Sequence, residues 1–199
     1  MKSTRVYLMR HGEVANGGEK RYNGHIDVDI TPLGEEQMRR LASRLAGRPL
    51  RAVYSSDLIR SAKGAEIIAK RLGLVHTPLR SLRERSIGAW EGMTAEEIRE
   101  RFPGEYAAWR ADLLNYRPTD GECLLDVRER VLPAYRSLVV AHPGQEIAML
   151  LHGGVNRVIL AEVMGMPFEN LFRVDQAFGA LNIIEHFDDG VAVVRLLNG

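Results

Sequence analysis

Short apolar runs alternate along the chain with longer segments in which apolar residues recur at helical spacing. Residues 6–9, 52–55 and 147–151 are apolar runs of the length expected for buried strands. Residues 181–187 and 191–197 flank an Asp-Asp-Gly turn, and this pattern predicts a terminal β-hairpin. We therefore expect the α/β class: a three-layer α/β/α sandwich around a mostly parallel sheet with an antiparallel edge strand.

The predicted helices begin at residues that favour helix N-termini and end near glycines. The N-terminal signals are Thr31 with Pro32, then Ser56 or Asp57, and then Thr94 with Glu97. The C-terminal signals are Gly47, Gly73 and Gly165. Two further helices are expected over residues 126–142 and directly after the run 147–151.

Residues 102–121 fit this alternation least well. They contain the rings of Tyr106, Trp109 and Tyr116 together with two prolines. We interpret residues 1–199 as a single domain with an insertion over the expected site at about 102–121. The rings are either available to stack on a base or they pack the insertion onto the sheet.

Composition and charge exclude several classes of protein. The chain carries 27 Lys and Arg against 26 Asp and Glu, a formal net charge of +1, so no overall field would recruit nucleic acid or an anionic membrane. The single cysteine, Cys123, excludes an intramolecular disulfide and a cysteine-based zinc site. No apolar run reaches the roughly 20 residues of a membrane span or the apolar segment of a signal peptide. We expect a cytoplasmic protein without nucleic-acid or membrane partners, and a homodimer remains open.

The densest candidate chemistry follows the first apolar run. Arg10 and His11 come where a strand is expected to end, and open α/β sheets build their sites at that edge. Arg10 offers a planar fork of donors suited to phosphate oxygens, and the imidazole of His11 can attack phosphorus to form a phosphohistidine. Gly12 would let the backbone approach a ligand closely. A histidine after a strand is, taken alone, more often structural.

His152 occupies the same place after the run 147–151. Gly153 and Gly154 follow it and open a helix, whose N-terminus favours anions. Two His-Gly pairs at strand ends indicate one shared site for phosphoryl transfer. The plainer alternative is that both histidines only cap their strands.

Arg60 and Glu84 complete the candidate set. Arg60 lies one turn into the helix after the run 52–55 and could reach back over the edge of the sheet. Glu84 could protonate a leaving oxygen, provided that burial keeps its carboxyl protonated near neutral pH. The plainer alternatives are a solvated helix arginine and a surface pair between Arg83 and Glu84.

In this order the motifs resemble the histidine phosphatase superfamily, also called phosphoglycerate mutase-like, over nearly the whole chain. The matching segments are Arg10-His11-Gly12-Glu13, the Tyr-Ser-Ser-Asp-Leu-x-Arg block at 54–60, Leu82-Arg83-Glu84 with the Gly-x-Trp-Glu-Gly tail at 88–92, and His152-Gly153-Gly154. The resemblance implies the phosphoglycerate mutase-like fold and a phosphoric monoester hydrolase.

The resemblance also implies a role for each residue. His11 would be the nucleophile, and its attacking nitrogen would be unprotonated because the other nitrogen donates to a backbone carbonyl. Arg10, Arg60 and His152 would hold the phosphoryl oxygens, and Glu84 would be the proton donor and then the base for water. The further phosphate- or substrate-binding residues that it implies are Gly153, Asn16 and Gly24. No cofactor or metal is expected, because two arginines and two histidines replace the usual cation.

Four positions depart from the family's pattern. Val14 stands where Thr or Ser is common, and Gly17 stands where Asn is common. Gly64 replaces a Thr, which we expect to loosen local packing, and Cys123 replaces the Ser of a Gly-Glu-Ser motif. None of these positions is one of the five proposed catalytic residues.

The residues after Glu84 favour the phosphatase branch, because mutases of the family carry extra basic residues there and a longer, ordered tail. Residues 24–37 look like the same stretch of α-ribazole phosphatases of cobalamin synthesis, and similar stretches occur in broad-specificity phosphatases. We expect a small-molecule phosphomonoester as the substrate, with α-ribazole 5′-phosphate as a candidate. The alternatives are a phosphoglycerate mutase, a fructose-2,6-bisphosphatase, and a binding module for a phosphorylated ligand.

Two other phosphatase chemistries have weaker matches in the sequence. Asp27 and Asp29 fit the Asp-x-Asp-x-Thr pattern of magnesium-dependent aspartyl phosphatases, but no buried strand precedes them. Cys123 and Arg128 fall one residue short of the Cys-x5-Arg spacing of cysteine phosphatases. The remaining histidines are scattered without metal-ligand spacing, so zinc is not expected.

Overall fold

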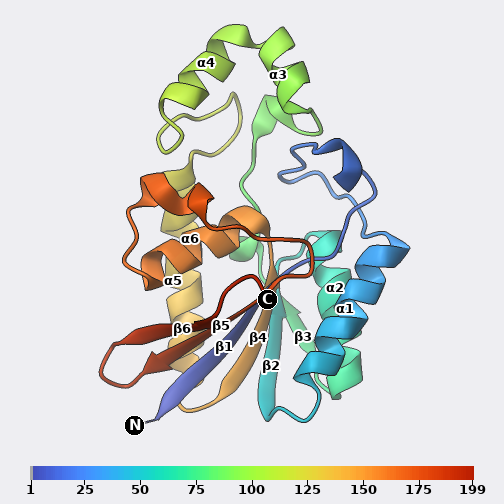
Figure 1. Ribbon diagram of the computed structural model, residues 1–199, viewed down its shortest axis with the longest axis vertical. Coiled ribbons are helices and arrows are strands. Elements are labelled where there is room, and N and C mark those ends of the chain that lie inside the picture. The colour runs from blue at the N-terminus through green and yellow to red at the C-terminus, as the bar shows by residue number, and fades with distance from the viewer. Residues whose placement is uncertain (1) are drawn as a thin grey trace.

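The computed structural model describes residues 2–199 and contains a six-stranded sheet with helices on both faces (Figure 1). The strands are β1 (Ser3–Arg10), β2 (Leu50–Ser55), β3 (His76–Pro78), β4 (Glu146–Leu151), β5 (Leu181–Phe187) and β6 (Ala192–Leu196). Their order across the sheet is β3-β2-β4-β1-β5-β6. The first four of these are mutually parallel, whereas β5 is antiparallel to both β1 and β6, so the predicted hairpin and mixed sheet are confirmed.

Two pairs of helices make the outer layers. The helices are α1 (Pro32–Leu45), α2 (Ile59–Leu72), α3 (Ala95–Arg101), α4 (Pro103–Ala111), α5 (Leu124–Ala141) and α6 (Gly153–Val163). Met38 of α1 and Ile68 of α2 are buried in one core cluster with the sheet, and Val131 of α5 and Val158 of α6 in the other. Figure 1 shows the two pairs on opposite sides of the strands, which confirms the α/β/α sandwich.

The helix ends follow most of the expected signals. The side chain of Thr31 accepts the backbone N–H of Gly34 at 3.0 Å, so it caps α1 as predicted. Gly73 ends α2 in the left-handed conformation with φ of +68°. The expectation that Ser56 or Asp57 caps α2 is wrong, because Leu58 holds that position and the first N–H, of Ile59, is bound by the carboxylate of Asp27 from another loop.

The segment around residues 102–121 lies beyond the end of the sheet to which the parallel strands point. It contains α4, which follows α3 closely, and Figure 1 shows both helices there, away from the sheet and the other helices. Tyr106, Trp109 and Tyr116 pack around the buried Trp90 rather than onto the sheet. The rings of Trp90 and Tyr116 stack with centroids 5.6 Å apart. The assignment of the whole chain to a single domain stays a prediction.

Within residues 2–199, the helices are too short or too polar for any of them to cross a bilayer.

Candidate active site

The register of the sheet brings two histidines together. Arg10, the last residue of β1, pairs with Leu151, the last residue of the parallel strand β4. The residues that follow, His11 and His152, therefore lie side by side, with ring centroids 5.3 Å apart. Both are buried, with 5% and 0% of their surface exposed. The predicted meeting of the two His-Gly pairs is thus present in the fold.

The hydrogen bond of His11 determines which of its ring nitrogens is free. Nδ1 lies 2.8 Å from the carbonyl oxygen of Gly12, and because a carbonyl can only accept, Nδ1 carries the proton. Burial, followed by the charges of Arg10 and Arg60, holds the pKa of His11 well below its usual range, so the ring is neutral at pH 7. In a neutral imidazole with a protonated Nδ1, Nε2 keeps its lone pair and can act as a nucleophile.

His152 is held by a residue that the sequence analysis named only as a helix cap and not as part of the site. Its Nε2 lies 2.6 Å from the hydroxyl oxygen of Ser56, the residue that follows β2. Its buried Nδ1 has no hydrogen-bond partner among residues 2–199. Burial, followed by the charge of Arg60, holds the pKa of His152 well below its usual range. An unpaired buried ring nitrogen beside His11 is typical of a site that a ligand completes.

Two arginines, the half-buried Arg10 and the buried Arg60, supply positive charge next to His11. Arg60, from the first turn of α2, is 2% exposed and donates to the carbonyl oxygens of Ile26 at 2.7 Å and Gly24 at 2.5 Å. Arg10 donates to the carbonyl of Gln176, and its guanidinium carbon lies 4.0 Å above the ring of Phe178. Burial lowers the pKa of Arg10 to about 10, so both guanidinium groups remain charged at pH 7.

The carboxyl group of Glu84 faces the same site. Its Oε2 accepts the N–H of Gly154 at 2.9 Å, in the first turn of α6, and its Oε1 accepts the N–H of Arg85 at 2.9 Å. A Cβ on Gly154 would lie 2.5 Å from Oε1, so only glycine leaves room for the carboxyl group there. The carboxylate of Glu84 therefore binds backbone N–H groups and forms no surface pair with Arg83, whose guanidinium binds Asp57 instead.

The loop that carries Glu84 is held by Arg130 of α5. Its guanidinium has five N–H donors and uses all of them. Three go to the carbonyl oxygens of Ser81, Arg83 and Glu84, at 3.0, 2.7 and 2.8 Å. The other two bind the carboxylate of Glu122, which also accepts the N–H of Ser86 at 2.9 Å. Arg130 therefore fixes the backbone on both sides of Glu84.

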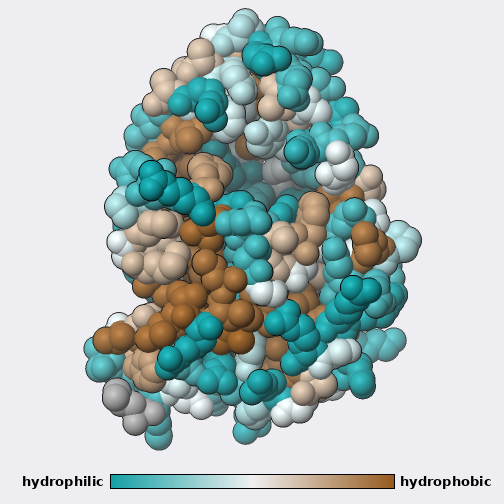
Figure 2. Space-filling view, in the orientation of Figure 1, coloured by the Kyte–Doolittle hydropathy of each residue, from teal (hydrophilic) through white to brown (hydrophobic). Residues whose placement is uncertain are grey.

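Most of the predicted site residues border one cavity of about 810 Å³, whereas His152, fully buried beside His11, is not part of its lining. Arg10, His11, Arg60 and Glu84 line its floor together with Gly153 and Gly154, and Trp109 and Arg110 of α4 line its outer wall. Figure 2 shows the surface hollowed beneath α3 and α4. The cavity has the size of sites that bury a small molecule.

The remaining predicted residues lie in different environments. Gly24 and Gly153 line the cavity, and the Gly24 carbonyl binds Arg60. The side-chain amide of Asn16 exchanges two hydrogen bonds with that of Asn23, and Asn23, not Asn16, lines the cavity. Gly12 was expected to let the backbone approach a ligand. The structure gives another reason for glycine there, because a Cβ at this position would clash with the backbone of Gly34.

The structure shows what surrounds two of the residues that depart from the family's pattern, Gly64 and Cys123. A Cβ on Gly64 would lie 2.6 Å from Leu150 and 3.0 Å from Met38, so the expectation of loosened packing is wrong and the site is full. Cys123 is buried at the N-terminus of α5, where its N–H is bound by Asp126.

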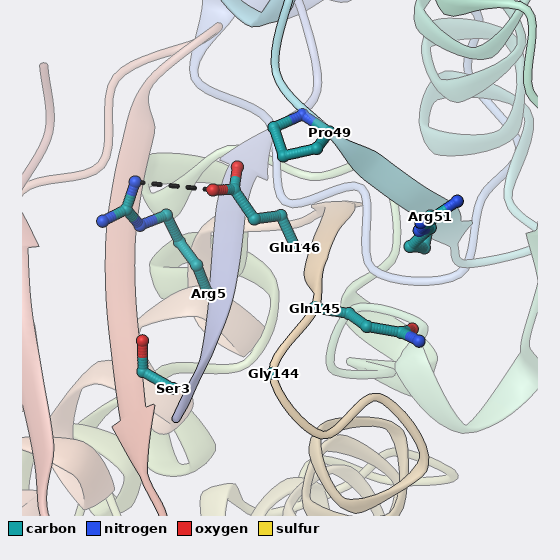
Figure 3. A pocket seen from close by; sticks show the side chains of 7 residues that line it. All are labelled: Ser3, Arg5, Pro49, Arg51, Gly144, Gln145 and Glu146. Carbon is teal, nitrogen blue, oxygen red and sulfur yellow. Dashed lines mark ion pairs between the residues drawn. The ribbon is translucent and has the colours of Figure 1, made fainter. Parts of the chain in front are cut away.

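A second, smaller cavity of about 250 Å³ lies at the opposite edge of the sheet, where β1, β2 and β4 begin (Figure 3). Arg5 and Glu146 form an ion pair of 3.6 Å across it. It contains none of the predicted site residues.

The comparisons with known proteins agree with this geometry. A family model described as the histidine phosphatase superfamily (branch 1) matches residues 6–199. A glucosyl-3-phosphoglycerate phosphatase of Mycolicibacterium vanbaalenii is 33% identical over 177 residues, which cover 85% of this chain and 78% of the relative. The adenosylcobalamin/alpha-ribazole phosphatase of Escherichia coli is 30% identical over 197 residues, covering 98% and 95%. The solved structure of YhfR from Bacillus stearothermophilus superposes with a TM-score of 0.89 at 31% identity, covering 97% of this chain and 96% of that one.

Proposed function

Since this chain belongs to the histidine phosphatase superfamily and is a phosphatase of that family, we propose that it hydrolyses a small phosphomonoester through a phosphohistidine on His11. The observation that carries the proposal is the hydrogen bond from Nδ1 of the buried His11 to the Gly12 carbonyl, which leaves Nε2 free to attack. The ring of His11 lies beside the buried ring of His152, and it shares one cavity with the guanidinium groups of Arg10 and Arg60. The chemistry requires no cofactor or metal ion.

In the first step Nε2 of His11 attacks phosphorus, a P–N bond forms, and the P–O bond to the leaving group breaks. Glu84 gives its proton to the departing oxygen, which leaves as an alcohol. In the second step a water molecule loses a proton to Glu84 and attacks phosphorus, the P–N bond breaks, and inorganic phosphate leaves. Arg10, Arg60 and His152 hold the phosphoryl oxygens and stabilise the charge that develops on them.

The buried polar atoms of the site support this assignment. Nε of Arg10 and Nδ1 of His152 are both without a hydrogen-bond partner among residues 2–199. Buried polar groups are rarely left unpaired, and a phosphoryl group with its acceptor oxygens would complete such donors. A module that only binds a phosphorylated ligand would gain nothing from the Glu84 carboxylate in the same cavity.

The first of two candidate substrates is α-ribazole 5′-phosphate. The look of residues 24–37 supports it, as does the name of the Escherichia coli relative. Trp109 lines the cavity and offers aromatic surface to a base. The name of the mycobacterial relative supports a second candidate, a phosphorylated glycerate, which the excess of basic side chains around the cavity favours. The first candidate is tested by the ratio of kcat/KM for α-ribazole 5′-phosphate to kcat/KM for phenyl phosphate. A ratio near one would contradict this candidate.

The proposed chemistry is tested by hydrolysis of p-nitrophenyl phosphate in excess EDTA. We expect full activity in the chelator, no activity in His11→Ala, and nearly unchanged activity in the matched variant Asp27→Asn. Loss of activity in EDTA or in Asp27→Asn, with His11→Ala still active, would instead indicate a metal-dependent aspartyl phosphatase. Isomerisation of 3-phosphoglycerate much faster than its hydrolysis would favour the mutase alternative.

The role of Glu84 is tested separately through the leaving group. We expect Glu84→Gln to slow the hydrolysis of alkyl phosphates by about 10²–10⁴-fold, the range of general acid catalysis, because an alkoxide needs a proton to leave. Hydrolysis of p-nitrophenyl phosphate should suffer much less, because nitrophenolate leaves without one. An equal loss on both substrates would show that Glu84 is not the acid.

A further inference from the structure

The cavity around His11 is much more basic than the chain as a whole. Positive and negative side chains nearly cancel over the sequence, whereas the only acidic side chain that lines the cavity, within the described chain of residues 2–199, is Glu84. Arg10 and Arg60 belong to the proposed phosphoryl site. The other basic residues of the lining are Lys20, Arg21, Arg85, Arg110 and Arg157.

Two of these five side chains are already engaged within the protein. Arg21 forms ion pairs with Glu19 at 2.6 Å and Glu97 at 2.9 Å. Arg85 is buried and donates to the carbonyl oxygens of Glu122 and Tyr116. Their positions therefore have structural reasons that do not involve a ligand.

Arg157 differs because it is largely enclosed and yet donates no hydrogen bond to a carboxylate. Its side chain is 19% exposed, and its Nε donates to the carbonyl oxygen of Val174 at 2.7 Å. Among residues 2–199, its Nη1 and Nη2 make no hydrogen bond. The exposed Asp175 lies 3.9 Å from Nη2, and the carboxylate of Glu84 acts on Arg157 through its charge without a hydrogen bond. Enclosing a guanidinium without a hydrogen-bonded anion costs free energy, so such a group is typical of a site that an anion fills.

The position of Arg157 relative to the phosphoryl site is defined by Gly153. A Cβ on Gly153 would lie 3.2 Å from Nη1 of Arg157 and 3.4 Å from Nε of Arg10, so the two guanidinium groups flank this glycine. Arg10 and Arg60, but not Arg157, are close enough to lower the pKa of His11. Arg157 therefore lies next to the phosphoryl site but farther from the attacking nitrogen of His11 than Arg10 and Arg60 do.

We propose that the substrate carries a second anionic group, a carboxylate or a further phosphate close to the transferred one, and that Arg157 binds it. Of the two candidate substrates, this favours the phosphorylated glycerate, because α-ribazole 5′-phosphate has no second anionic group. The inference rests on the proposed phosphatase function. An anion at this place would give the Nη donors of Arg157 a charge-assisted partner and would offset the repulsion between its guanidinium and that of Arg10. Arg157 would thereby select substrates by charge, without contacting the phosphorus that His11 attacks.

The test uses two substrates with the same three-carbon skeleton and the same phosphate. 3-Phosphoglycerate has a carboxylate where glycerol 3-phosphate has a hydroxymethyl group, so their ratio of kcat/KM, measured by phosphate release, isolates the second anion. We expect the wild-type protein to prefer 3-phosphoglycerate by about tenfold or more, as one charge-assisted contact allows. Equal values for the two substrates would contradict the proposal.

The variant Arg157→Met tests the residue. We expect kcat/KM for 3-phosphoglycerate to fall about 10- to 100-fold and that for glycerol 3-phosphate to change by less than about threefold. Arg157→Lys should keep part of the preference, and it decides the question if the methionine variant does not fold. Arg173→Met, on an exposed arginine outside the cavity, is the matched control and should keep the full preference.

Three outcomes are distinct. A proportional loss on both substrates would mean that Arg157 acts on the transferred phosphoryl group or on the fold, and it would overturn the proposal. Retention of the wild-type preference in Arg157→Met would overturn it too. Absence of p-nitrophenyl phosphate hydrolysis by the wild-type protein would instead refute the phosphatase function on which the proposal rests.

Discussion

The contacts of Arg130 predict that a residue remote from the substrate controls the proton donor. The variant Arg130→Met removes all five hydrogen bonds of the guanidinium while keeping an apolar stem in α5. The carbonyls of the loop around Glu84 and the carboxylate of Glu122 then lose their common partner. We expect the backbone of the loop to become mobile and the carboxyl group of Glu84 to be less well placed.

The magnitude follows from the burial of the pair. Removing one partner of a fully buried ion pair costs about 3–5 kcal/mol. Because the side chains of Arg130 and Glu122 are 23% and 22% exposed, we expect a loss of about 2–4 kcal/mol in the free energy of unfolding. Glu84 keeps its bonds to Gly154 and Arg85, so the rate for poor leaving groups should fall by about 10- to 100-fold, less than the complete loss of a general acid.

The assay is kcat/KM for a series of aryl and alkyl phosphates, plotted against the pKa of the leaving alcohol. Arg130→Met should make the plot steeper, with little change for p-nitrophenyl phosphate. Arg136→Met, which removes an exposed arginine of the same helix that pairs with Glu162, is the matched control and should leave the slope unchanged. A lower melting temperature with an unchanged slope would refute the reasoning, because it would assign Arg130 to the fold alone.

The packing and charge of the site lead to four further predictions. Gly154→Ala should mimic Glu84→Gln in a leaving-group series, because the added Cβ would lie 2.5 Å from Oε1 of Glu84; an unchanged slope would contradict this. Gly64→Thr should destabilise the fold by about 1–3 kcal/mol in denaturant titrations, because α1 and β4 leave it no space, and a gain in stability would contradict it. Because burial lowers the pKa values of His11 and His152, kcat/KM corrected for substrate ionisation should persist below about pH 6.5, the ordinary imidazole value. Loss of activity with a midpoint at pH 6.5 would contradict the lowered pKa values of the two histidines. Below pH 6.5 the unfolded state binds more protons than the folded state, so the free energy of unfolding should fall as the pH drops.

The strand ends and the pair of histidines could be predicted from the sequence. Buried strands are short apolar runs, and in an open parallel sheet the residues that follow them gather at one edge, so His11 and His152 had to meet if their strands were neighbours. The hairpin could be predicted from its turn, and α1 from the Thr31 cap. The strand β3 was missed because its three residues are mostly exposed and show no apolar alternation.

The supporting contacts could not be predicted, because they join residues far apart in the sequence. Ser56 reaches His152 only through the pairing of β2 with β4, although its place directly after an apolar run was a signal that could have been used. Arg130 and Arg157 sit on helices and look like ordinary solvated arginines in a sequence. Asp27 caps α2 from a distant loop, a role that no local pattern contains.

The most direct test of the account is to identify the phosphorylated residue during turnover. The protein is mixed with p-nitrophenyl phosphate, quenched rapidly at alkaline pH, digested, and analysed by mass spectrometry. We predict an acid-labile phosphate on the peptide that contains His11, and none in His11→Ala. Turnover by the wild-type protein with the phosphate on another residue would contradict the account.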